Sequence, residues 1–86
     1  MGAKVTFKLF ATLQDYLPAE AKKTNALALD LEPGTTVAQV VERFALPIRL
    51  VHLVLIDGTF IAPADRAGRV LKDGETLAIW PPVAGG

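Results

Sequence analysis

The residues best suited to chemistry stand at the end of the sequence, which reads WPPVAGG. Proline has no backbone N–H to donate to a strand ladder, so regular strand pairing is expected to stop at about Pro81. Glycine lacks a Cβ atom, so Gly85 and Gly86 would fit a channel too narrow for other residues. The ending therefore predicts a flexible tail that presents the carboxylate of Gly86 as its functional group. This tail comprises Pro81, Pro82, Val83, Ala84, Gly85 and Gly86.

The rest of the sequence offers little for catalysis or for metal binding. His52 is the one histidine, and no second ligand or nucleophile stands at a suggestive spacing from it. No glycine-rich phosphate loop is present, and the sequence contains no cysteine for a disulfide, a zinc site or a thiol nucleophile. The acidic residues near the end fall in turns, where solvated side chains are usual; they are Asp57, Asp65, Asp73 and Glu75. We expect no enzyme, no metal site and no bound cofactor.

Composition excludes further classes of function. The 86 residues suffice for one domain, and a formal net charge of +0 provides no field to gather nucleic acid or anionic lipid. No stretch approaches the roughly 18 apolar residues of a membrane span, and the first residues do not resemble a signal peptide. We therefore expect a cytoplasmic protein that binds neither nucleic acid nor membrane.

The elements that position the tail are mainly strands. Residues 4–10 alternate strictly, with Val5, Phe7 and Leu9 on the buried side, and similar patterns predict strands over 26–31, 52–56, 59–62 and 76–81. Asp57-Gly58 is typical of a two-residue hairpin turn. Residues 11–17 are expected to form a short helical turn, and residues 18–25 a loop.

One helix is predicted after the second strand. Thr36 and Gln39 have the spacing of a capping box. Behind them an apolar stripe recurs at helical spacing over about three turns, and Pro47 is expected to end the helix. The stripe consists of Val37, Val40, Val41 and Phe44. Together the elements predict an α+β domain over residues 1–80, with the helix across one face of a mixed sheet and the tail at 81–86.

Three aromatic side chains are predicted on the sheet face opposite the helix: Phe10, Phe60 and Trp80. Their placement requires Ile61 to point inward, because a shift of one residue would reverse Phe60. A cluster of this kind near the tail is typical of a surface that docks a protein partner. Lys4 and Lys8 share the strand side of Phe10 and would border the cluster, where they can steer an acidic partner or be merely solvated.

The whole chain resembles the MoaD/ThiS family of ubiquitin-like sulfur carriers, which have the β-grasp fold and end in Gly-Gly, and it is most similar to the small subunit of molybdopterin synthase. The resemblance rests on VTFKLFATLQDYL, GTTVAQVV, LKDGETLAIW and PPVAGG. It implies that an E1-like adenylyltransferase of the MoeB/ThiF type uses ATP to adenylate Gly86. A persulfide sulfur donor would then yield a thiocarboxylate, which a large synthase subunit of the MoaE type uses to make molybdopterin for a molybdenum or tungsten cofactor.

Other functions fit the same sequence. A carrier of this kind can supply sulfur to thiazole synthesis or RNA thiolation. A ubiquitin-like modifier would join its activated Gly86 to a lysine of another protein, and a plain interaction domain would have an inert tail.

Overall fold

The alternation at the start of the sequence forms strand β1 (Ala3–Leu9) in the computed structural model, which describes residues 2–82. Val5, Phe7 and Leu9 are buried, whereas Lys4 and Thr6 are exposed. One face of the strand therefore belongs to the core, as the pattern predicts.

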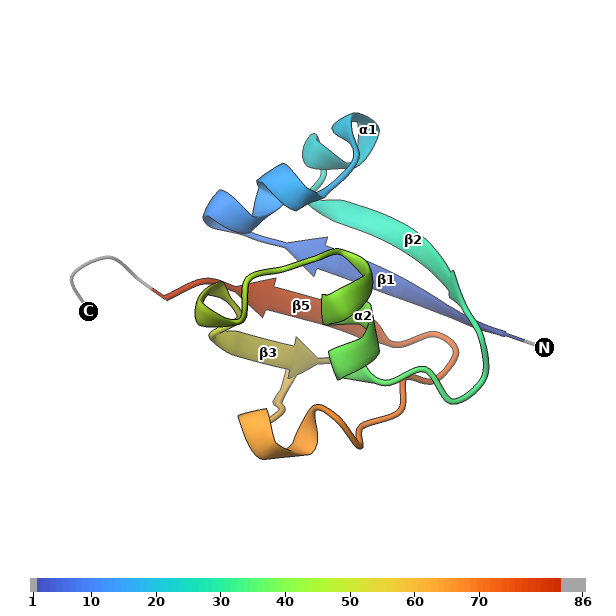
Figure 1. Ribbon diagram of the computed structural model, residues 1–86. Coiled ribbons are helices and arrows are strands. Elements are labelled where there is room, and N and C mark those ends of the chain that lie inside the picture. Colours follow the sequence, from blue (N-terminus) through green and yellow to red (C-terminus); the bar gives the residue numbers. More distant parts are fainter. Residues whose placement is uncertain (1, 83–86) are drawn as a thin grey trace.

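The five strands form one mixed sheet in the order β2-β1-β5-β3-β4 (Figure 1). Their bounds are Ala26–Leu31 for β2, Leu53–Ile56 for β3, Thr59–Phe60 for β4 and Thr76–Trp80 for β5. The pair β1 and β5 is parallel, and the other neighbouring strands are antiparallel. The final strand thus lies between strands from the two halves of the chain.

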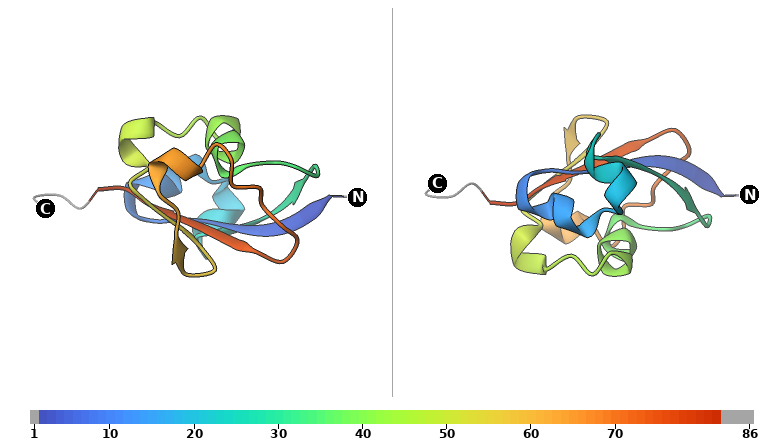
Figure 2. Two further views of the ribbon diagram at one scale, coloured as in Figure 1. Left: turned by 90° about the horizontal axis from the view of Figure 1, so that it is seen from below. Right: turned by 90° about the horizontal axis from the view of Figure 1, so that it is seen from above.

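Helix α2 (Val37–Arg43) lies on one side of the sheet (Figure 2). The predicted capping box is confirmed: the Gln39 backbone N–H donates to Thr36 Oγ1 at 3.3 Å, and the Thr36 N–H donates to Gln39 Oε1 at 2.9 Å. These bonds satisfy two N–H groups that a helix start leaves without partners. Val37, Val40 and Val41 are buried toward the sheet.

The prediction that α2 has about three turns and stops at Pro47 was wrong, because the helix ends after seven residues. The Leu46 N–H donates to the Val41 carbonyl at 3.1 Å, and the Ala45 N–H donates to the Glu42 carbonyl at 2.9 Å. This is a Schellman motif, in which Ala45 adopts a left-handed φ of 54°. The backbone therefore leaves the helix before it reaches the proline.

Two short helices follow β1. The 3₁₀ helix η1 (Ala11–Tyr16) confirms the predicted helical turn. The expected loop over 18–25 is wrong in part, because α1 (Ala19–Lys22) forms a single helical turn. Four residues are too few to show a helical period, and the turn instead buries Ala21 against the core.

Strands β3 and β4 form the predicted hairpin. Asp57 and Gly58 both have positive φ, 49° and 85°, as a two-residue turn requires. The first strand begins one residue later than expected, after the 3₁₀ helix η2 (Ile48–Leu50). The return strand stops at Phe60 rather than Ala62, because the chain turns into the 3₁₀ helix η3 (Pro63–Asp65).

The core lies between the inner face of the sheet and α2, and every strand except β4 contributes to it. Phe7 of the central strands and Phe44 at the end of α2 are in contact, with ring centroids 4.8 Å apart. No helix within residues 2–82 is both long and apolar enough to cross a membrane.

Candidate functional site

The candidate site begins where β5 leaves the sheet. The last strand residue is Trp80, whose carbonyl accepts the His52 N–H at 3.1 Å. Pro81 and Pro82 follow outside the strand, as predicted from their missing N–H groups. The other predicted tail residues lie outside the described residues; they are Val83, Ala84, Gly85 and Gly86.

Phe10 and Trp80 form a stacked pair beside this exit point. Their ring centroids are 4.2 Å apart and their planes differ by 2°. The contact follows from strand pairing, because Leu9 lies opposite Ile79 and the Phe10 N–H donates to the Ile79 carbonyl at 3.2 Å. Both aromatic rings are half-buried, so each keeps an accessible part next to the root of the tail.

Phe60 lies on the same face of the sheet, as the predicted register requires. It stands opposite Leu55 on β3 and is 53% exposed, whereas the next residue, Ile61, is buried. Leu55 in turn stands opposite Ala78 on β5. Phe60 is therefore separated from the Phe10–Trp80 pair by β3 and does not stack with it.

Two further apolar residues complete this face and were missed by the sequence analysis. Leu53 pairs with Trp80, and Leu55 pairs with Phe60, so both half-buried leucines connect the aromatic residues. The alternation in the run HLVLI could have identified them, because Val54 and Ile56 occupy the inward positions. We call Phe10, Leu53, Leu55, Phe60 and Trp80 the outer apolar surface.

A basic residue borders this surface on the side of β1. Lys8 pairs with Ala78, so Lys8, Ala78, Leu55 and Phe60 form one row across four strands. Lys4 is exposed on the same face, two pleat repeats away along β1 and beyond Thr6. Lys8 therefore borders the surface as predicted, whereas Lys4 shares its face but lies beyond the pair of Thr6 and Thr76.

Three acidic side chains that were expected to be merely solvated support the fold instead. Asp57 Oδ1 accepts the Thr76 N–H at 2.8 Å, which connects the hairpin turn to the start of β5. Asp73 Oδ1 accepts the Lys4 N–H at 2.8 Å and so fixes the start of β1. The third is Glu75, which pairs with Arg69 at 2.6 Å. That hydrogen bond holds the pKa of the Glu75 carboxyl below its ordinary value.

Arg66 holds together the loops around β3, a role that its isolated position in the sequence does not reveal. Its guanidinium donates to the carbonyls of Val51 and His52, each at 3.1 Å, and its Nε donates to the Ile61 carbonyl at 3.3 Å. Partial burial lowers the pKa of Arg66. Since His52 also bonds to Trp80, this arrangement fixes the strand next to the tail root.

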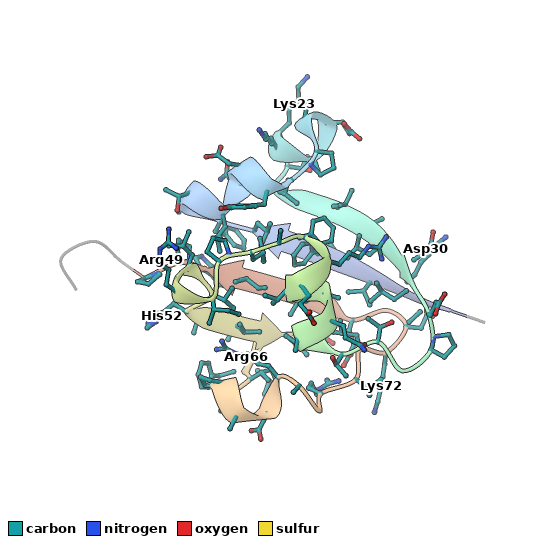
Figure 3. The ribbon with its side chains drawn as sticks, in the orientation of Figure 1. Lys23, Asp30, Arg49, His52, Arg66 and Lys72 are labelled. Carbon is teal, nitrogen blue, oxygen red and sulfur yellow. The ribbon has the colours of Figure 1, made fainter. Side chains whose placement is uncertain are left out.

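The His52 side chain itself is exposed at the surface (Figure 3). No group of three or more potential metal ligands from histidine, aspartate or glutamate occurs among residues 2–82.

A five-stranded mixed sheet with one main helix across one face defines the ubiquitin-like β-grasp fold, as predicted. The family described as Mut7-C ubiquitin matches residues 2–85, and the chain belongs to this family. No curated protein sequence matches the chain significantly.

Three solved structures from archaea are similar to this one. The chain is 26% identical to SAMP1 from Haloferax volcanii, with a TM-score of 0.66 and coverage of 98% of this chain and 100% of the other. It is 27% identical to small archaeal modifier protein 1 from Methanosarcina acetivorans, with a TM-score of 0.66 and coverage of 100% and 99%. The Haloferax volcanii HVO 2177 protein has the same fold at 23% identity, with a TM-score of 0.73 and coverage of 99% and 88%.

Proposed function

We propose that this protein is a sulfur carrier that works through the carboxylate of Gly86. The observation that supports this most directly is the junction of β5 with the tail sequence. The last strand of a ubiquitin-like domain ends at Trp80, and the sequence PPVAGG follows it directly. The proposal requires Gly86 to bear a free α-carboxylate in the cell, which an intact mass of the protein isolated from its source tests. The protein itself acts as a co-substrate in the cytoplasm and not as a catalyst.

The chemistry needs activation, because a carboxylate is a poor electrophile. An E1-like adenylyltransferase of the MoeB/ThiF type joins the Gly86 carboxylate to AMP and releases pyrophosphate from ATP. The terminal sulfur of a donor persulfide then attacks the carbonyl carbon, and AMP leaves. A thiol finally cleaves the sulfur–sulfur bond, which leaves a thiocarboxylate on Gly86 and a disulfide on the donor.

The outer apolar surface suits the docking step of this cycle. Phe10 and Trp80 present accessible aromatic area beside the tail root, and such area is frequent at the centre of protein interfaces. A partner that covers them would receive the tail next to its own active site. We assign this role to the activating enzyme and to a large molybdopterin synthase subunit of the MoaE type, which makes molybdopterin for a molybdenum or tungsten cofactor.

The decisive experiment is activation of the purified protein with an E1-like enzyme from its own organism, ATP and a persulfide donor. Intact mass should show replacement of one terminal oxygen by sulfur, and this change should require ATP. A chain extended beyond Gly86 is the matched control and should stay unmodified. A mass unchanged under conditions in which the enzyme releases pyrophosphate would contradict the carrier function.

A second function is favoured by the similarity to small archaeal modifier protein 1. In this alternative the activated Gly86 forms an isopeptide bond with a lysine of another protein. Tagged protein expressed in its source organism would then appear in a ladder of larger covalent species. Their absence, together with a thiocarboxylate, would favour sulfur transfer alone, either to molybdopterin or to thiazole or RNA thiolation.

A further inference from the structure

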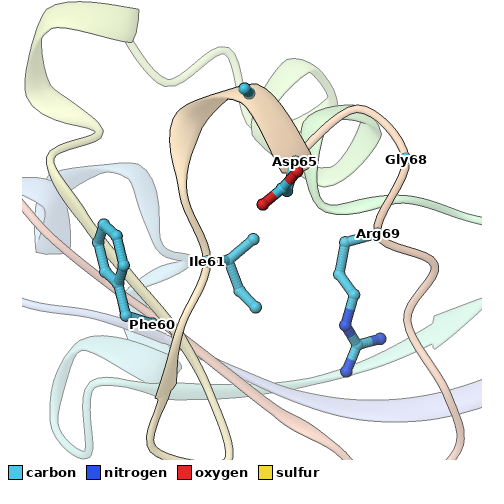
Figure 4. Close-up of a pocket in the computed structure, with 6 residues that line it drawn as sticks. Phe60, Ile61, Asp65, Gly68 and Arg69 are labelled. Carbon is cyan, nitrogen blue, oxygen red and sulfur yellow. The ribbon is translucent and has the colours of Figure 1, made fainter.

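A hollow of about 470 Å³ lies beside β4, at the edge of the sheet where the outer apolar surface ends. Phe60 and Ile61 form one wall, and Asp65 and Arg69 approach from the segment that follows η3. Figure 4 shows the Asp65 carboxylate directed toward Ile61, with Phe60 and Arg69 on opposite sides. The hollow therefore combines an aromatic ring, an aliphatic base and two charged groups.

The positive charge of the hollow is already neutralised. Arg69 donates to both carboxylate oxygens of Glu75, at 2.6 and 3.3 Å, and also to the Val70 carbonyl. The Lys72 N–H donates to the same carboxylate at 2.7 Å, which fixes Glu75 in this position. A paired guanidinium of this kind has little charge left to attract an anion.

The negative charge of Asp65 is not neutralised in this way. Its side chain is exposed, and among residues 2–82 it has neither a hydrogen-bond donor nor a cationic partner. Its backbone is held independently, because the Asp65 N–H donates to Ala62 at 2.9 Å and its carbonyl accepts from Gly68 at 3.2 Å. The hollow thus offers a positioned carboxylate with a net negative charge.

The Phe60 ring adds a second feature that suits a cation. It is 53% exposed, and the face of an aromatic ring attracts ammonium and guanidinium groups. Phe60 also belongs to the outer apolar surface through its pairing with Leu55. Phe60 and the inward-facing Ile61 lie on opposite faces of β4, so a partner that covers that surface reaches the hollow around this edge strand (Figure 4).

We propose that this hollow binds a lysine or arginine side chain of the protein that docks on the outer apolar surface. The inference rests on the docking step of the proposed function and adds the chemistry of the partner. The aliphatic stem of the bound side chain passes the edge of β4 at Phe60, and its cationic group pairs with the Asp65 carboxylate (Figure 4).

The position of the hollow gives the interface a direction. Lys8 stands at the other end of the row that contains Phe60, three strand spacings or about 14 Å away. The partner should therefore carry a basic group for Asp65 and an acidic group for Lys8, at opposite ends of an apolar centre. A partner rotated by 180° would place its basic group at Lys8 and its acidic group at Asp65. Repulsion between these like charges disfavours that orientation.

The hollow can be tested without the partner, by NMR titration of the full chain with Nα-acetyl-L-arginine amide at low ionic strength. Saturable changes in the backbone amide chemical shifts are expected within residues 60–69. Asp65→Asn should weaken the affinity obtained from these changes about threefold or more. The control variant is Asp15→Asn, because Asp15 is an exposed carboxylate on η1. The neutral probe Nα-acetyl-L-norleucine amide should not bind. Shifts that are absent, or equal in the wild type and Asp65→Asn, would overturn the proposal.

The link to docking is tested by ATP–pyrophosphate exchange with the E1-like enzyme. Asp65→Lys should raise the KM for the carrier about tenfold and leave kcat unchanged, while Asp15→Lys should change neither. Normal exchange with an unchanged KM for Asp65→Lys would refute the inference but leave the carrier function intact. If the wild type gives no ATP–pyrophosphate exchange, the proposed function fails. The NMR titration with Nα-acetyl-L-arginine amide still decides whether the hollow binds a cation.

Discussion

The stacked pair of Phe10 and Trp80 shows how one contact can serve both stability and recognition. Each ring covers the other, yet both are only half-buried, so neither belongs to the core. Aromatic pairs contribute about 0.5–1.5 kcal/mol beyond the area they bury. The remaining accessible area is available to a partner beside the tail root.

Truncation of this pair should therefore affect docking more than folding. Phe10→Ala is expected to lower the free energy of unfolding by about 1–2 kcal/mol and to raise the KM for activation at least about tenfold. Urea denaturation and pyrophosphate exchange measure the two effects. Ile48→Ala is a matched control, because Ile48 is 78% exposed and η2 lies on the α2 side of the sheet (Figure 2). Equal increases of KM in both variants would contradict a docking role for Phe10.

Ala45 is a non-glycine residue in a backbone conformation that favours glycine. It occupies the left-handed position of the Schellman motif, which glycine adopts without steric cost. Ala45→Gly should raise the free energy of unfolding by about 0.5–1 kcal/mol, as measured by chemical denaturation. Ala38→Gly, inside α2, should instead lower it by about 0.5–1 kcal/mol. A destabilised Ala45→Gly variant would show that the left-handed conformation is not maintained in solution.

At the scale of elements, the ion pair between Arg69 and Glu75 connects the loop after η3 to the start of β5. The hydrogen bond from Arg69 lowers the Glu75 pKa in the folded protein, against an ordinary value of 4.5. The resulting stabilisation is present above that value and disappears as the pH falls through the lower, folded pKa.

A pH series of Glu75→Gln tests this connection. The wild type should have the larger free energy of unfolding at pH 7, and the difference should shrink as the pH falls from about 4.5 toward the lower pKa of Glu75 in the folded protein. Denaturant midpoints at several pH values give the comparison. A difference that stays constant down to pH 3 would mean that the charge of Glu75 contributes nothing.

Elements whose own residues show a periodic apolar pattern or a typical turn could be predicted from the sequence. The strands β1 and β2, the start of α2 and the Asp57-Gly58 turn each combine an apolar period or turn residues with suitable flanks. The α1 turn could not be predicted, because four residues contain no period and Ala21 is held by tertiary contact. The end of α2 depends on a left-handed alanine, which local preference disfavours.

The candidate site was predictable to the extent that strand alternation determines which face a side chain occupies. That rule placed Phe10, Phe60 and Trp80 on one face, and it also applies to Leu53 and Leu55. The roles of Arg66 and Asp65 could not be predicted, because both depend on residues brought together from other elements. Single charged residues in a loop carry no spacing that identifies such contacts.

For the whole molecule, the sheet and α2 should fold independently of the last two residues. Among residues 2–82, the buried residues of the core run from Ala3 to Ile79. Deletion of Gly85 and Gly86 should therefore leave the free energy of unfolding within about 0.5 kcal/mol of the wild type. The same deletion should abolish activation by the E1-like enzyme. A lower denaturation midpoint would show that the tail contributes to the fold.

The central place of β5 has a consequence for how the protein is made. Strands β1 and β2 pair with each other, and so do β3 and β4, but β5 is the strand that joins these pairs. A nascent chain still holding residues 76–80 inside the ribosome can form only two separate hairpins. The sheet therefore closes late, through contacts between the first and last parts of the chain, which makes folding slow relative to a helical protein of this size. A tail competent for activation would emerge only as that closure becomes possible.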